Sequence, residues 1–182
     1  KDLPERSPDD PVDSRMEWER DGQYYHYLTK WMHALSRLGS VTEKGIYHRW
    51  ALELAEAAHR AFVVAGPDGA PRGMVWKMSI DLSHPLVSSM GQHDPLDGLV
   101  TYQELLDAAS QEPSWPDLSA EISEMKSICR GLRWETSDAL GIGGLLSERY
   151  LRAQSALPNA GFAKELVDEV VTAAATSLGQ YV

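Results

Sequence analysis

A helical period in the apolar residues, present along most of the chain, is the feature that most constrains the fold. From Gln23 onward, apolar side chains recur at three- and four-residue steps, a pattern that predicts a helix ending at Gly39. The same reasoning predicts further helices over about 46–62, from 95 or 98 to 109, and over 117–130, 142–156 and 163–178. Amphipathic helices joined by short turns bury their apolar faces against one another, so the sequence predicts an all-α fold.

Two segments depart from this helical pattern. Residues 1–22 mix prolines with charges of both signs and predict an extended arm or linker, with residues 23–182 forming the helical domain. Between Gly73 and Gly98, polar and apolar residues alternate over 74–83, which predicts one short strand within a long loop. Asp94, followed by Pro95, is typical of an N-cap, so a new helix is expected to start there.

The composition excludes several function classes. The formal net charge is −10, so we expect no nucleic-acid partner. No apolar run approaches the roughly 18–20 residues of a membrane span, so we expect no membrane partner. Cys129 is the only cysteine, which excludes an intrachain disulfide and a multi-cysteine zinc site. No metal-ligand spacing such as H-E-x-x-H occurs, so we expect neither a metal nor a cofactor. A single thiol and the lack of an export signal favour the cytoplasm.

One candidate site lies on the first predicted helix. His26, Lys30 and His33 are spaced i, i+4 and i+7, so they share one helix face. Such a face either lines a polar cavity, where histidines exchange protons or bind hydroxyls, or is the solvent-exposed side of an amphipathic helix.

A second candidate precedes a helix start. Gln92 and His93 lie where backbone N–H groups and the helix dipole favour negative charge, so His93 is a candidate general acid or base. Helix capping alone explains Asp94. In the predicted strand, Lys77 and Asp81 share one face and either converge on a ligand or form an exposed ion pair.

Aromatic residues coincide with these polar clusters. The chain has six Trp and seven Tyr but only two Phe. Trp and Tyr combine an apolar ring face with a hydrogen-bonding N–H or O–H group, which suits hydroxyl-rich ligands such as sugars. Tyr24 lies next to the histidine face, and Trp76 lies next to Lys77. Two other apparent motifs are better explained by packing, namely the glycines of 141–144 and Cys129.

The segments YHYLTKWMHALSRLG and YHRWALELAEAAHRAF resemble one helical hairpin of the (α/α) toroid proteins, the six-hairpin glycosidase-like superfamily that includes N-acylglucosamine 2-epimerase-type proteins. The resemblance implies helical hairpins around a funnel that acts on sugars by epimerisation, glycosidic hydrolysis or elimination. Residues 23–182 have room for about three hairpins at roughly 40–47 residues each. The expected fold is therefore about half of a toroid, apparently its C-terminal half, completed by another chain or by a missing N-terminal half.

These observations lead to three functional hypotheses. In the first, a small carbohydrate is the ligand, His93, Lys77 and Asp81 are catalytic, and the substrate-binding residues are Tyr24, His26, Lys30, His33, Trp76 and Gln92. His93 exchanges the proton and Lys77 stabilises charge. The second is a non-catalytic helical-array binding module. The third is an inactive toroid homologue. No pair of glutamates is placed as in a glycosidase, since Asp81, Asp94 and Asp97 are the only carboxylates near the cluster.

Overall fold

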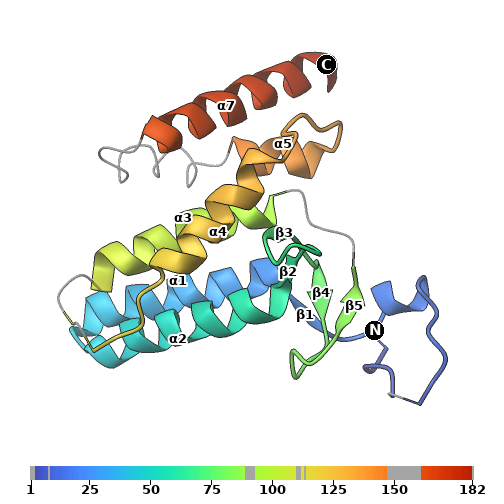
Figure 1. Ribbon diagram of the computed structural model, residues 1–182, viewed down its shortest axis with the longest axis horizontal. Helices are drawn as coiled ribbons and strands as arrows, with labels where there is room; N and C mark the ends of the chain where they lie inside the picture. Colours follow the sequence, from blue (N-terminus) through green and yellow to red (C-terminus); the bar gives the residue numbers. More distant parts are fainter. Residues whose placement is uncertain are drawn as a thin grey trace.

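The computed structural model of the chain describes residues 3–7, 9–88, 93–109, 112, 114–146 and 161–181. A helical hairpin is its largest unit (Figure 1), formed by α1 (Tyr25–Thr42) and α2 (Gly45–Phe62). The two helices are joined by Glu43 in the left-handed conformation (φ 56°) and Lys44 in an extended one, which lets the chain reverse in two residues.

The other helices pack on this hairpin in turn. Helix α3 (Asp94–Ala109) contacts both α1 and α2, and α4 (Ser119–Arg130) packs on α3. The short helix α5 (Ala139–Leu145) then contacts α7 (Gly161–Tyr181), which lies on the side of the molecule away from α2 (Figure 1). The part of the predicted helix 142–156 that follows 146 lies outside the described residues.

Two small antiparallel sheets lie at one end of the hairpin. One has the strand order β1-β4-β5, made of β1 (Gln23–Tyr24), β4 (Lys77–Met78) and β5 (Pro85–Val87). The other pairs β2 (Val63–Ala65) with β3 (Pro71–Met74) around a turn in which Gly69 has a positive φ of 78°.

The predicted all-α half-toroid is therefore wrong, because the chain between α2 and α3 forms sheets and not a further hairpin of helices. Directly after α2, residues 63–74 form a β-hairpin, with the turn at 66–70. Within the alternating stretch 74–83, only Met74, at the end of β3, and the two residues of β4 are in strands. Strand β4 pairs with β5 nearby in the chain and with β1 some fifty residues earlier, and no local period reveals the distant pairing.

The N-terminal segment is held against the three-stranded sheet. A single 3-10 turn, η1 (Met16–Trp18), interrupts it, and a parallel bridge joins Leu3 to Arg20. Glu17 is buried and receives a hydrogen bond from Arg6 at 3.1 Å. Trp18 packs on Trp76 with ring centroids 4.5 Å apart.

One core joins the helices and the strands. Large buried members of this core come from α1, α2, α3, α4 and β4: Tyr25, Met32, Leu52, Phe62, Met78, Tyr102, Leu105 and Met125. No helix among the described residues is long and apolar enough to cross a membrane.

Candidate functional site

The candidate site is a polar seam, defined as the facing polar side chains of α1 and α3. On α1 these are His26, Thr29, Lys30 and His33, and on α3 they are Asp94, Asp97, Thr101 and Glu104. Each set recurs at three- and four-residue steps, so each forms a stripe along one helix face.

Hydrogen bonds hold the two stripes in register. Thr29 Oγ1 donates to Asp97 Oδ2 at 2.5 Å, and one turn further along, His33 Nε2 lies 3.0 Å from Thr101 Oγ1. The other ring nitrogen of His33 is 3.2 Å from Glu104 Oε2. Thr29, Asp97 and Thr101 are all buried, so these bonds form in a low-dielectric environment that strengthens them.

Asp94 is the most perturbed carboxyl group of the seam. Its side chain is only 6% exposed, and its Oδ2 has no hydrogen-bond partner within the part of the chain that the structure describes. Burial raises the pKa of Asp94 to about 7, and the negative charge of Asp97 adds to this, while the Lys30 ammonium acts in the opposite direction. A buried carboxyl group with this pKa holds or releases a proton near neutral pH.

Two groups of α1 complete the charge pattern around the carboxyl pair. Lys30 is exposed, so its ammonium lies at the solvent side of the seam. His26 is half-buried, and desolvation lowers the pKa of its ring despite the opposing effect of Asp97. The imidazole is therefore neutral at pH 7 and has one donor and one acceptor nitrogen.

His93 lies at the start of α3. Its carbonyl oxygen accepts the first intrahelical bond from Asp97 N at 2.9 Å, so His93 occupies the N-cap position that the sequence assigned to Asp94. Its ring packs against α5, where a Cβ on Gly141 would lie 3.0 Å from Nε2. Burial lowers the pKa of His93 in spite of Asp138 nearby, and neither ring nitrogen has a hydrogen-bond partner in the described ranges.

An aromatic cluster adjoins the seam at His26. The Tyr24 ring lies 5.6 Å from the His26 ring and 5.4 Å from the Trp76 ring, measured between centroids. Tyr27 packs edge-on against both Tyr24 and His26, and Trp18 extends the cluster beyond Trp76. Four rings and one imidazole thus form a continuous surface of the kind that stacks on sugar rings.

Lys77 is fully buried beneath this cluster. Its Nζ donates to the carbonyl oxygens of Glu17, at 2.9 Å, and of Arg20, and it lies 5.0 Å from the centre of the Tyr24 ring. These contacts direct the ammonium toward the N-terminal segment, where it satisfies buried carbonyl groups.

Asp81 lies in the turn between β4 and β5 and is exposed. It accepts hydrogen bonds from Ser79 Oγ at 2.7 Å and from Ser83 N at 3.0 Å, and these lower the pKa of Asp81 to about 2. This carboxylate stabilises a turn, with Glu5, Arg6 and His84 as its neighbours around a shallow cavity. Gln92 lies outside the described residues.

The structure therefore brings together six of the predicted residues: Tyr24, His26, Lys30, His33, Trp76 and Lys77. What the sequence reasoning missed is the stripe of α3. Asp94, Asp97, Thr101 and Glu104 follow one another at helical spacing, but Asp94 was explained by capping and Asp97 was considered only as a carboxylate near the histidine cluster.

Among the described residues, no three His, Cys, Asp or Glu side chains are grouped in a way that could hold a metal ion. Comparisons of the chain with protein-family models, with curated proteins and with solved structures gave no match.

Proposed function

We propose that this protein acts on a small carbohydrate by acid–base proton transfer, with Asp94 as the group that exchanges the proton. The observation that carries the proposal is the pair of buried carboxyl groups one helical turn apart on α3. Asp97 Oδ2 accepts a hydrogen bond from Thr29, whereas Asp94 Oδ2 has no partner among the residues that the structure describes. Two carboxyl groups in different environments are typical of sites where one acts as the acid and the other stays ionised.

The surrounding residues have matching roles. The Lys30 ammonium stabilises negative charge that develops on a substrate oxygen. The neutral imidazole of His26 both donates to and accepts from hydroxyl groups, and the rings of Tyr24 and Trp76 offer apolar faces to the sugar. His93, at the N-cap of α3, is a second group that can exchange a proton there, since neither ring nitrogen has a hydrogen-bond partner among the described residues. Lys77 and Asp81 have no catalytic role in this proposal, since their contacts explain them structurally.

A specific observation favours the second candidate function, a non-catalytic binding module. The outer faces of α1 and α2 expose three large rings, namely Tyr27 (55% exposed), Trp31 (64%) and Trp50 (47%). Exposed aromatic side chains of this kind often mark a contact surface.

The test is to incubate the protein with a panel of mono- and disaccharides in D₂O and to follow deuterium incorporation and bond cleavage by NMR. We expect turnover of at least one sugar, reduced by about 10²-fold or more in Asp94→Asn and also reduced in His93→Ala. Asp107→Asn, an exposed carboxylate on the same helix, is the matched control and should keep full activity. Turnover that survives intact in Asp94→Asn would refute the assignment. Thermal stabilisation by a sugar without turnover would favour the binding module, and the absence of both would refute a carbohydrate function.

A further inference from the structure

Each helix of the α1–α2 hairpin carries an exposed apolar stripe. From Tyr27 to Val41 on α1, apolar residues recur at alternating steps of four and three residues, which is the spacing of a coiled-coil seam. On α2, apolar residues recur at steps of four and three residues from Ile46 to Ala61. Together these two stripes form what we call the outer face. Its large side chains that are 41% to 82% exposed are Tyr27, Trp31, Leu38, Val41, Ile46 and Trp50.

The two stripes point away from α3, which covers the opposite side of the hairpin. Thr29 donates a hydrogen bond to α3 and lies nine residues before Leu38, and nine residues make about two and a half helical turns. The ring of His59 packs on α3, and His59 lies nine residues after Trp50. On each helix the exposed stripe is therefore opposite the side that contacts α3.

Half-buried leucines connect the outer face to the core. Leu35 and Leu54 lie one helical turn after Trp31 and Trp50, and both pack against the core of the molecule. Ala34 is exposed and small, so it leaves a gap in the row of large side chains on α1. A row of large apolar side chains with such a gap is the kind of surface into which the side chains of another helix pack.

The hairpin is basic although the chain as a whole is acidic. Residues 25–62 have five Lys and Arg against three Asp and Glu, whereas the whole chain has 17 against 27. Helix α1 has no acidic residue, and Lys30 and Arg37, seven residues apart, flank its stripe on one side. Arg37 has no ion-pair partner in the ranges that the structure describes. Glu53 of α2 is already paired with Arg49 at 2.7 Å, so the outer face favours an acidic partner.

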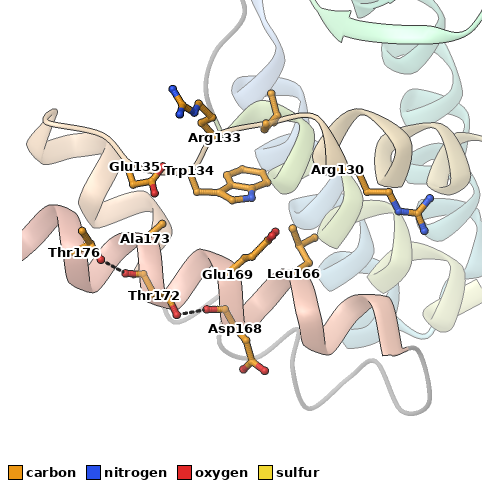
Figure 2. A pocket seen from close by; sticks show the side chains of 11 residues that line it. Arg130, Arg133, Trp134, Glu135, Leu166, Asp168, Glu169, Thr172, Ala173 and Thr176 are labelled. Carbon is orange, nitrogen blue, oxygen red and sulfur yellow. Dashed lines mark hydrogen bonds between the residues drawn. The ribbon is translucent and has the colours of Figure 1, made fainter.

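The cavity between the end of α4 and α7 lacks such a single sign of charge. Its charged lining residues are two arginines and three acidic residues. Figure 2 shows that the arginines, Arg130 and Arg133, point away from each other and from Trp134. The charges of this cavity therefore do not converge on a ligand, unlike the cations that flank the outer face.

We propose that the outer face binds an amphipathic helix of a partner protein, whose apolar stripe is flanked by acidic residues. The apolar side chains of that helix pack on the stripes of α1 and α2, and its carboxylates lie beside Lys30 and Arg37. A second copy of this chain fits less well, because two basic hairpins would then face each other. Such a partner uses the exposed rings that support the second candidate function, and its binding is independent of sugar turnover in the seam.

Isothermal titration of the whole chain with two synthetic peptides tests the proposal. Both peptides have about three heptads with Leu at positions a and d, and they differ only in having Glu or Lys at positions e and g. We expect the Glu peptide to bind at least about tenfold more tightly than the Lys peptide, with a difference that shrinks as salt is added. Because the whole chain is acidic, unspecific attraction would favour the Lys peptide instead. Equal binding of the two peptides, or no binding of the Glu peptide up to about 1 mM, would overturn the proposal.

Substitutions on the hairpin locate the site. Trp31→Ala should weaken binding of the Glu peptide about tenfold or more, and Arg37→Gln should weaken it about two- to fivefold. Glu53→Gln removes an acidic group beside the outer face and should strengthen binding by about two- to fivefold, a gain that a folding defect does not produce. If Trp31→Ala and Arg37→Gln bind the Glu peptide as the unchanged protein does, the outer face is not the site and the proposal is refuted.

Two control variants should bind the Glu peptide as the unchanged protein does. Arg72→Gln removes the same charge as Arg37→Gln from an exposed position on β3, outside the hairpin. Asp94→Asn alters the seam and not the outer face, so loss of sugar turnover with intact peptide binding separates the two proposals.

Other occupants of the outer face give different results. We expect the chain alone to be a monomer in analytical ultracentrifugation and not to bind vesicles of equal parts phosphatidylcholine and phosphatidylserine. Dimerisation that Trp31→Ala abolishes would assign the outer face to a second copy and overturn the proposal. Vesicle binding that Trp31→Ala abolishes, without binding of the Glu peptide, would assign it to a lipid surface and also overturn the proposal.

Discussion

Replacing Asp94 with asparagine should stabilise the folded protein at neutral and alkaline pH. Asparagine has nearly the shape of aspartate but does not ionise, so the change removes the energetic penalty of a buried charge. Asp94 is 6% exposed and lies one turn from Asp97, and both features disfavour its charged form. The variant therefore isolates the electrostatic cost of keeping this carboxyl group in the seam.

The size of the effect follows from the pKa of Asp94 in the two states. The pKa is about 7 in the folded chain, against an ordinary value of 3.8. Between these values the folded state binds a proton that the unfolded state has lost, so the stability of the unchanged protein falls as the pH rises through this window. About three pKa units correspond to a total loss of about 4 kcal/mol, present in full above pH 7 and absent below pH 4.

Urea unfolding of both proteins at about pH 5 and pH 8 measures this difference. The stability of Asp94→Asn relative to the unchanged protein should rise by about 3 kcal/mol between the two values. Asp107→Asn on the exposed side of α3 is the control and should show no such change. If the difference between Asp94→Asn and the unchanged protein is the same at both pH values, Asp94 does not have a raised pKa, and the acid–base proposal loses its basis.

Three further predictions concern the packing around the site. Lys77→Met leaves the carbonyl oxygens of Glu17 and Arg20 without their donor, so it should destabilise the fold by about 3 kcal/mol in urea unfolding. The N-terminal segment should also be cleaved earlier by a protease. An unchanged unfolding midpoint would contradict this role of Lys77. Gly98→Ala places a Cβ against the Tyr25 hydroxyl and 2.9 Å from the methyl carbon of Met125, so it should lower the free energy of unfolding by about 1–3 kcal/mol. The control is Gly143→Ala, whose Cβ would have no atom within 4 Å and which should not destabilise the protein. Burial raises the pKa of Cys129 to about 12, so its thiol should react with a disulfide reagent at about pH 8 only after unfolding. Rapid reaction of the folded protein would show that the Cys129 thiol is accessible and contradict this.

The helices could be predicted well from local sequence. The expected helix over 46–62 corresponds to α2 at Gly45–Phe62, and the helix expected from Pro95 or Gly98 to Ala109 corresponds to α3 at Asp94–Ala109. Their apolar stripes determine which face is buried, and that information is present within each segment. The sheets were missed because β1 pairs with β4 across some fifty residues of chain, a pairing that no local period encodes.

The candidate site was predicted in part for the same reason. The shared face of His26, Lys30 and His33 is a property of one helix, so the spacing alone revealed it. Whether that face met solvent or another polar surface depended on which helix packs against it. The answer is α3, which places Asp94 and Asp97 opposite the stripe.

The sequence by itself thus determined the helices, their buried faces and the polar stripes that they carry, because side-chain spacing on a helix follows from backbone geometry alone. The tertiary structure decided what these stripes do. Docking of α3 on α1 removes water from Asp94, which shifts its pKa toward neutrality, and docking of the N-terminal segment makes Lys77 a buried anchor. The pKa of Asp94 and the anchoring role of Lys77 both depend on burial and on contacts between residues distant in the chain, so neither can be predicted from the neighbouring sequence.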